Sequence, residues 1–126
     1  MRRCETVLIA GCGELGQRVG QLLLQHGDRV LGLRRHTAAL PPGIEALAGD
    51  LAVGVPALPP LDRVVFCAAP DDGGAAAYRA VYELGFGTLL RALRGAAVSP
   101  RRVLLVTSTR CYAQRDGGWV DEDSPV

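Results

Sequence analysis

The chain has 126 residues and a net charge of +1, with 48% hydrophobic and 21% charged residues. This is the length of one domain, and the composition is too apolar for a disordered chain. The near-neutral charge and the 5% of aromatic residues argue against a nucleic-acid-binding surface. All 14 basic residues are arginines, so this chain cannot complete a mechanism that needs a lysine.

The cysteines and the hydropathy pattern predict neither a zinc site nor a membrane segment. Cys4, Cys12, Cys67 and Cys111 lie far apart, and none of them forms a Cys-x-x-Cys pair. No apolar run approaches the roughly 18 residues that indicate a transmembrane helix. We therefore expect a cytoplasmic protein without a metal site.

The first half of the chain combines apolar runs with one amphipathic segment. Residues 6–10 form a short apolar run, which predicts a strand buried on both faces. From Leu15 onward the apolar positions follow helical spacing, which predicts a helix that ends near His26 with Gly27 as its C-cap. Two further strands are expected at residues 29–33 and 44–48.

The middle of the chain contains one loop and one strongly apolar strand. Residues 51–60 contain three prolines and one glycine, which predict a loop. Residues 63–69 include the run Val-Val-Phe-Cys-Ala-Ala, which predicts a buried strand.

The last part of the chain completes an alternation of strands and helices. A long helix is expected over residues 73–94, although Gly85 and Gly87 weaken it. Residues 102–106 predict a final strand, whereas residues 107–126 have no strong period and predict a loop. Apolar strands that alternate with helices indicate an α/β fold, in which right-handed crossovers connect the strands of a parallel sheet.

A glycine-rich sequence, Gly-x-Gly-x-x-Gly, connects the first strand to the first helix. This is the context that the dinucleotide-binding fingerprint requires. Gly11 would permit the tight turn, Gly13 would let a diphosphate approach bare backbone, and Gly16 would let the helix pack closely on the strand. The alternative is a turn that binds no ligand. The cofactor-binding residues predicted from this loop are Gly11, Cys12, Gly13, Glu14, Leu15 and Gly16.

The end of the second strand indicates which dinucleotide would bind. A site that prefers NAD usually has an Asp or Glu there, which accepts hydrogen bonds from the ribose hydroxyls. This chain has Arg34 and Arg35, whose guanidinium groups can bind a 2′-phosphate but cannot accept a hydrogen bond. We therefore predict NADP rather than NAD as the preferred cofactor. The alternative is that both arginines are simply solvated on an exposed turn.

Several motifs along the chain resemble the short-chain dehydrogenase/reductases, in particular the NAD(P)-dependent epimerase/dehydratases of the extended and atypical branch. Besides the glycine loop, residues 87–90 are similar to the Gly-Thr-x-x-Leu run of the family's central helix. The most specific segment is residues 103–112, which resembles the strand that ends in Ser-Ser-x-x-x-Tyr. Residues 121–125 resemble the Glu-x-x-Pro stretch that follows this strand.

The resemblance implies further site residues. Ser108, four residues before Tyr112, falls on the family's catalytic serine, which would donate a hydrogen bond to a substrate oxygen. The alternative for Ser108 is a strand-end hydroxyl that caps local backbone. Asp50 is similar to the family's adenine-contacting aspartate. The other cofactor-binding residues that the resemblance implies are Leu51, Ala68, Ala69, Pro70 and Thr107.

The resemblance also implies a fold class, which is a Rossmann-type doubly wound parallel sheet over residues 1–126. The chain departs from the family in three respects. Its loop lacks the usual Gly-x-x-Gly-x-x-Gly spacing, and Leu84 occupies the usual position of an active-site Asn. The catalytic Tyr-x-x-x-Lys is absent, because Tyr112 belongs to the turn and neither Tyr78 nor Tyr82 has a lysine four residues later. We therefore expect an incomplete, N-terminal part of a longer protein.

These features lead to a functional expectation with two alternatives. We expect the dinucleotide-binding portion of an NADP-preferring, epimerase/dehydratase-like oxidoreductase that acts on a small molecule, for which a nucleotide sugar is one candidate. The first alternative is a non-catalytic NADP-binding sensor or scaffold. The second is another type of Gly-x-Gly-x-x-Gly dehydrogenase, against which residues 107–112 argue. Nucleic acids and membranes are not expected partners.

The strand at residues 102–106 would lie at the edge of the incomplete sheet. Its apolar side chains would then be exposed, together with unpaired backbone groups. We therefore expect the chain to associate with itself into a homo-oligomer.

Overall fold

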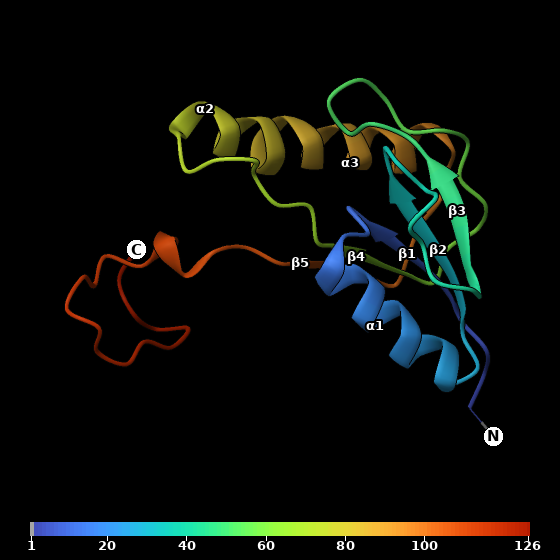
Figure 1. Ribbon diagram of the computed structural model, residues 1–126, viewed down its shortest axis with the longest axis horizontal. Coiled ribbons are helices and arrows are strands. Elements are labelled where there is room, and N and C mark those ends of the chain that lie inside the picture. The colour runs from blue at the N-terminus through green and yellow to red at the C-terminus, as the bar shows by residue number, and fades with distance from the viewer. Residues whose placement is uncertain (1) are drawn as a thin grey trace.

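In the computed structural model, which describes residues 2–126, a five-stranded parallel sheet forms the centre of the fold (Figure 1). The order of the strands is β3-β2-β1-β4-β5, so the sheet grows outward from β1 in both directions. This confirms the predicted Rossmann-type doubly wound fold. The strands are β1 (Thr6–Ala10), β2 (Arg29–Arg34), β3 (Ile44–Ala48), β4 (Arg63–Phe66) and β5 (Arg102–Leu105).

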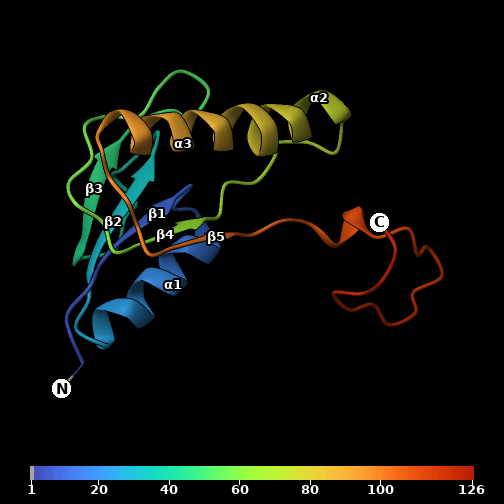
Figure 2. The same cartoon turned by 180° about the vertical axis from the view of Figure 1, so that it is seen from behind.

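Helices cover both faces of the sheet (Figures 1 and 2). Helix α1 (Glu14–Gln25) lies on one face. A longer helical stretch lies on the other face and consists of α2 (Ala75–Tyr78), the π-helical segment η1 (Arg79–Gly85) and α3 (Phe86–Gly95). One 3-10 turn, η2 (Thr109–Cys111), follows β5.

Two apolar clusters hold these layers together. Leu8 and Ile9 are neighbours in β1, yet each is fully buried in a different cluster, because successive side chains of a strand point to opposite faces. On the α3 side, the rings of Phe66 and Phe86 meet edge to face, with their centroids 5.1 Å apart. Burial on both faces explains why the central strands read as continuous apolar runs.

Two elements differ from the sequence-based expectation. The strand expected over residues 63–69 ends at Phe66, where the chain passes close to the glycine loop. A Cβ on Gly11 would lie only 2.4 Å from the backbone nitrogen of Ala68. The long helix forms, but its middle part is π-helical. Gly85 does not break this helix; it is buried there, and a Cβ would lie 3.1 Å from the carbonyl oxygen of Ala80.

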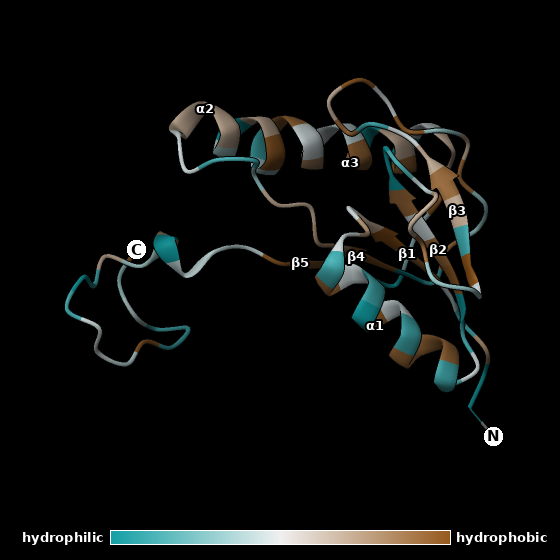
Figure 3. Ribbon diagram, in the orientation of Figure 1, coloured by the Kyte–Doolittle hydropathy of each residue, from teal (hydrophilic) through white to brown (hydrophobic). Residues whose placement is uncertain are grey.

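Strand β5 forms an apolar edge of the sheet, as the sequence predicts (Figure 3). Its side chains Val103, Leu104 and Leu105 are 37%, 53% and 38% exposed. Helix α1 packs on β1, β2 and β3, which run from the centre of the sheet to its other edge. The chain that follows β5 extends away from the sheet, and Trp119 within it is fully exposed (Figure 2).

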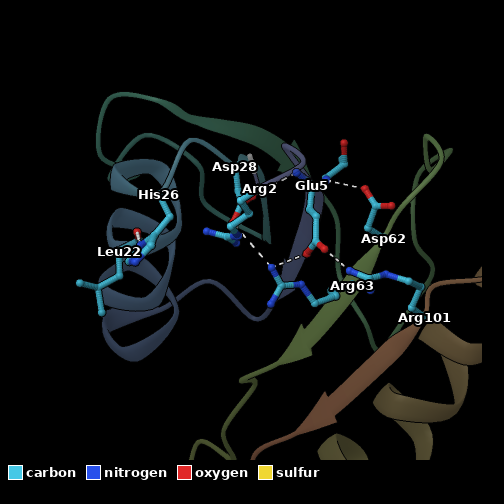
Figure 4. A network of polar contacts seen from close by, with 9 residues as sticks. Arg2, Glu5, Leu22, His26, Asp28, Asp62, Arg63 and Arg101 are labelled. Carbon is cyan, nitrogen blue, oxygen red and sulfur yellow. Dashed lines mark hydrogen bonds and ion pairs between the residues drawn. The ribbon is translucent and has the colours of Figure 1, made fainter.

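A network of charged groups joins the amino ends of the strands (Figure 4). Asp28, which precedes β2, is buried and accepts a hydrogen bond from the backbone N–H of Glu5 at 3.0 Å. Asp62, which precedes β4, accepts one from the backbone N–H of Thr6 at 2.8 Å. The arginines whose guanidinium groups pair with these carboxylates or with Glu5 are Arg2, Arg63 and Arg101.

Candidate functional site

A cleft of about 650 Å³ opens at the carboxyl ends of the strands. Open α/β sheets bind their ligands at this end, where the strand order reverses. The cleft collects all the predicted site residues except the side chains of Cys12 and Pro70. Those that line it are Gly11, Gly13, Glu14, Leu15, Gly16, Arg34, Arg35, Asp50, Leu51, Ala68, Ala69, Thr107 and Ser108.

The first glycine of the loop is required by backbone geometry. Gly11 has a φ of +79°, a left-handed conformation that favours glycine. The backbone N–H groups of Gly11 and Cys12 both donate to the carbonyl oxygen of Leu33, at 2.9 and 3.0 Å. These bonds fix the loop to the end of β2, while the missing side chain lets it pass against Ala68.

The second and third glycines have opposite surroundings. A Cβ on Gly16 would lie 2.8 Å from Cγ2 of Ile9, so the glycine lets α1 lie close to β1. A Cβ on Gly13 would meet no atom within 4 Å. Gly16 is therefore needed for packing, whereas Gly13 leaves open space beside the mouth of the helix.

Helix α1 presents unpaired hydrogen-bond donors at this mouth. Its N-cap, Gly13, has no capping side chain. The backbone N–H groups of Glu14, Leu15 and Gly16 donate to no other described residue. Such groups lie at the positive end of the helix dipole and favour an anion. The donors and the open space at Gly13 fit the diphosphate of a dinucleotide.

The two cysteines near the cleft are not reactive groups. Cys12 was predicted to bind cofactor, but its side chain is fully buried under the loop, and a Cβ on Gly32 would lie 3.0 Å from its sulfur. Cys67 lines the cleft. Burial raises the pKa of both thiols, so they remain protonated at neutral pH and are weak nucleophiles. Cys12 therefore contributes packing to the loop.

The predicted phosphate-binding arginines lie at the end of β2. Arg34 is half-buried, lines the cleft and forms no ion pair within residues 2–126. Arg35 is exposed, and its guanidinium lies 4.0 Å from the carboxylate of Asp71. On the neighbouring loop, Asp50 accepts a hydrogen bond from the backbone N–H of Ala52 at 2.9 Å. Arg34 is thus a cationic group available to a ligand.

Ser108 follows β5 and is the N-cap of the 3-10 turn η2. Its Oγ accepts a hydrogen bond from the backbone N–H of Arg110 at 3.1 Å. Tyr82 lines the cleft as Ser108 does, and its ring packs on that of Tyr78 with centroids 5.6 Å apart. The neighbouring polar side chains of Arg110 and Ser108 lower the pKa of Tyr78, and Cζ of Arg110 lies 5.6 Å from the centroid of its ring. Both predicted roles of Ser108, substrate contact and local capping, are compatible with this position.

The sequence interpretation missed two groups of lining residues. The residues of the first group are next to predicted site residues at the ends of strands, so they could have been predicted from their positions in the sequence. The second group, on η1, has no spacing motif that could have marked it, because it reaches the cleft through tertiary packing. The first group includes Leu33, His36, Gly49 and Cys67, and the second is Ala80, Val81 and Tyr82.

Within residues 2–126, no group of three or more His, Cys, Asp or Glu side chains could hold a metal ion. No helix in the described part of the chain has both the length and the apolar character needed to cross a membrane.

Solved structures reveal what this architecture resembles, although no protein-family model and no curated protein sequence matches the chain. A protein from Methylobacillus flagellatus, assigned as an NAD-dependent epimerase/dehydratase, is 32% identical, with a TM-score of 0.73. The alignment covers 98% of this chain and 44% of that protein. This chain resembles the N-terminal part of NAD-dependent epimerase/dehydratases.

Two further structures extend the comparison. A short-chain dehydrogenase/reductase superfamily protein from Agrobacterium tumefaciens, solved with bound NAD, is 25% identical over 95% of this chain and 38% of that protein, with a TM-score of 0.71. UDP-galactose 4-epimerase shares the fold, with a TM-score of 0.78 at 19% identity over 95% of this chain and 44% of that enzyme. The predicted resemblance to the superfamily and to its epimerase/dehydratase branch is confirmed. The chain spans less than half the length of these proteins.

Proposed function

We propose that the chain is the dinucleotide-binding portion of an epimerase/dehydratase-like oxidoreductase. The observation that carries this proposal is the set of unpaired N–H groups of residues 14–16 beside the open space at Gly13. The NAD-bound relative from Agrobacterium tumefaciens supports a nicotinamide dinucleotide as the ligand. When bound, this cofactor would take a hydride from a substrate carbon or return one.

Different residues of the cleft would bind different parts of the cofactor and the substrate. The N–H groups at the start of α1 would donate hydrogen bonds to the diphosphate. Asp50 and Leu51 would contact the adenine, and Ala68 and Ala69 would lie beside the cofactor at the end of β4. Ser108 would donate a hydrogen bond to the hydroxyl or carbonyl oxygen of a small-molecule substrate, for which a nucleotide sugar is one candidate. We propose that the protein acts in the cytoplasm.

We infer a preference for NADP from Arg34. Because this side chain has no carboxylate partner within residues 2–126, a 2′-phosphate would be its counter-charge. Arg35 would assist from the exposed side, where it lies beside Asp71.

Arg34→Ala is expected to weaken NADPH binding about 10- to 100-fold, as the loss of charge-assisted hydrogen bonds predicts. The affinity for NADH, which lacks the 2′-phosphate, should change little. Titrations followed by nicotinamide fluorescence measure both affinities, and Arg94→Ala, an exposed change at the end of α3, serves as the control. An NADPH preference that survives in Arg34→Ala, or tighter binding of NADH by the unmodified chain, would contradict the role of Arg34.

A non-catalytic NADP-binding sensor or scaffold is the second candidate function. It is favoured by Leu84, which replaces the family's active-site Asn and is 51% exposed. An aliphatic side chain cannot hold or pass a proton. If the reading frame continues beyond Val126 and encodes a Tyr-x-x-x-Lys motif, the oxidoreductase is supported; a continuation without this motif supports the sensor or scaffold.

We also propose that the β5 edge binds a second copy of the chain. Two copies of the same edge strand can pair about a two-fold axis, which would satisfy their free backbone groups and cover the apolar side chains.

Light scattering at micromolar concentration should therefore show a dimer or a larger species. Leu104→Arg should shift the protein toward the monomer, because it places a charge on a residue that is 53% exposed at this edge. Leu22→Arg is the matched control, since Leu22 is 57% exposed but lies on α1. A monodisperse monomer of the unmodified chain would refute this proposal.

A further inference from the structure

A second cavity lies at the amino ends of the strands, at the other end of the sheet from the cleft. Its volume is about 280 Å³. Four guanidinium groups and a single carboxylate line it, so its wall carries an excess of positive charge. Figure 4 labels four of these five side chains. They belong to Arg2, Glu5, Arg63, Arg101 and Arg102.

The register of the sheet places two of these arginines side by side. Arg63 is the first residue of β4, Arg102 is the first residue of β5, and the two are partners in the parallel pairing of these strands. Like charges on neighbouring strands repel each other. Glu5 pairs with Arg63 and Arg101, whereas Arg102 forms no ion pair within residues 2–126. An anion at the beginning of β4 and β5 would therefore offset the repulsion between Arg63 and Arg102.

The carboxylates engage few of the hydrogen-bond donors at this cavity. Arg2, Arg63 and Arg101 each contact their carboxylate partners through Nη2 alone. A guanidinium group has five N–H donors, so these pairs leave most of the donors unused. Nε of Arg63 is buried and has no hydrogen-bond partner within residues 2–126, although buried polar groups are normally hydrogen-bonded. The donors outnumber the acceptors, which favours a ligand with several acceptor oxygens.

We propose that this cavity binds a diphosphate group, either as inorganic diphosphate or as part of a nucleotide. The planar fork of a guanidinium group matches the oxygens of a phosphate, so arginine can bind a phosphate through two hydrogen bonds at once. Four cations against one anion favour a ligand with more than one negative charge. The volume is below the roughly 300–1,000 Å³ of pockets that enclose drug-sized ligands, which favours a compact anion. A diphosphate has both properties.

A buried carboxylate holds part of this site in place before an anion binds. The side chain of Asp28 is 0% exposed and lies 2.6 Å from the guanidinium of Arg2 and 3.6 Å from that of Arg63. These two cations are thus preorganised, which reduces the entropic cost of binding. Arg101 and Arg102 are exposed and would contact the anion from the β5 side. The bound diphosphate would join the segment before β1 to β4 and β5, so binding should stabilise the folded chain.

The test is a calorimetric titration of the chain with sodium diphosphate at constant ionic strength. Arg102→Gln should weaken this binding at least about tenfold, because it removes charge-assisted hydrogen bonds. Since Arg102 forms no ion pair within residues 2–126, the variant should fold, which circular dichroism checks. Arg94→Gln, an exposed change of the same charge at the end of α3, should leave the affinity unchanged. Titration with ADP distinguishes the two sources, because tighter binding of ADP than of inorganic diphosphate would identify a nucleotide.

The N–H groups at the start of α1 could also bind a diphosphate, so Gly13→Val separates the two places. Binding that is lost in Gly13→Val but unchanged in Arg102→Gln would place the anion in the cleft and overturn this proposal. Equal stabilisation by sulfate at the same ionic strength, measured by thermal unfolding, would overturn it as well, because it would indicate general screening of the arginines. The affinity for NADPH should be the same in Arg102→Gln and in the unmodified chain. A failure of the proposed dinucleotide function would therefore leave the result for this cavity intact.

Discussion

Gly13→Val is expected to abolish dinucleotide binding while the chain remains folded. The backbone of Gly13 is extended, with φ −83° and ψ −152°, so a residue with a side chain can adopt it. A Cβ there would meet no atom within 4 Å, and the valine therefore has room in the ligand-free protein. Its branched side chain would occupy the space beside the N–H groups of residues 14–16. The affinity for NADPH should fall at least about 100-fold, or about 2.8 kcal/mol.

Two further variants show that this loss is specific. Gly95→Val also meets nothing within 4 Å, but it lies at the end of α3, and NADPH binding should be unchanged. Gly11→Ala should instead unfold the chain at a lower temperature, because Gly11 has a φ of +79° and its Cβ would collide with the backbone of Ala68. Fluorescence titration and thermal unfolding measure the two effects. A Gly13→Val protein that binds NADPH normally would show that the diphosphate does not lie at this glycine.

The local parts of the fold and of the site could be predicted from the sequence. The strands Thr6–Ala10 and Ile44–Ala48 have the expected bounds, because each apolar run stops at a glycine that follows it directly or almost directly. The glycine loop could be placed for the same reason, since its turn, its helix N-terminus and its close packing involve neighbouring residues. Arg34 and Ser108 could be placed in the cleft because each follows or ends a predicted strand.

The remaining features depend on contacts between distant segments. The strand β4 ends early because Gly11 passes beside Ala68, and no propensity of residues 63–69 contains that information. The direction of the Cys12 side chain depends on its packing beside Gly32. Tyr78 and Arg110 lie 32 positions apart in the numbering, and their pairing requires η2 to reach the start of the helical stretch. Such placements follow from the assembled sheet and not from local patterns.

The sequence contains a signal for the charged network at the amino ends of the strands, although the predicted helices and strands alone do not reveal it. Its carboxylates come directly before the strands: Glu5 before β1, Asp28 before β2 and Asp62 before β4. In a parallel sheet the beginnings of all strands lie along one edge, so these groups must gather there. Because Asp28 and Asp62 accept hydrogen bonds from the backbone N–H groups of Glu5 and Thr6, they fix where β1 begins relative to β2 and β4.

Asp28→Ala should therefore lower the free energy of unfolding by a large fraction of the total for a domain of this size. The side chain of Asp28 is 0% exposed and lies 2.6 Å from the guanidinium of Arg2 and 3.6 Å from that of Arg63. Its removal leaves the N–H of Glu5 without its partner and Arg63 without one of its two counter-charges. Because both arginines remain partly exposed, we expect a loss of about 2–3 kcal/mol, less than for a fully buried pair.

Urea unfolding of Asp28→Ala measures this loss, with Glu83→Ala as the matched control. Glu83 also pairs with an arginine, Arg79, at 3.2 Å, but both side chains are about two-thirds exposed on the helix surface. Removal of such a pair should cost no more than about 0.5 kcal/mol. If the two variants unfold at the same urea concentration, burial of Asp28 does not stabilise the edge. The network matters for the site as well. Strand β1 ends at the glycine loop and β2 ends at Arg34. The positions of the loop and of Arg34 relative to each other therefore depend on the register between the two strands, which the network helps to fix.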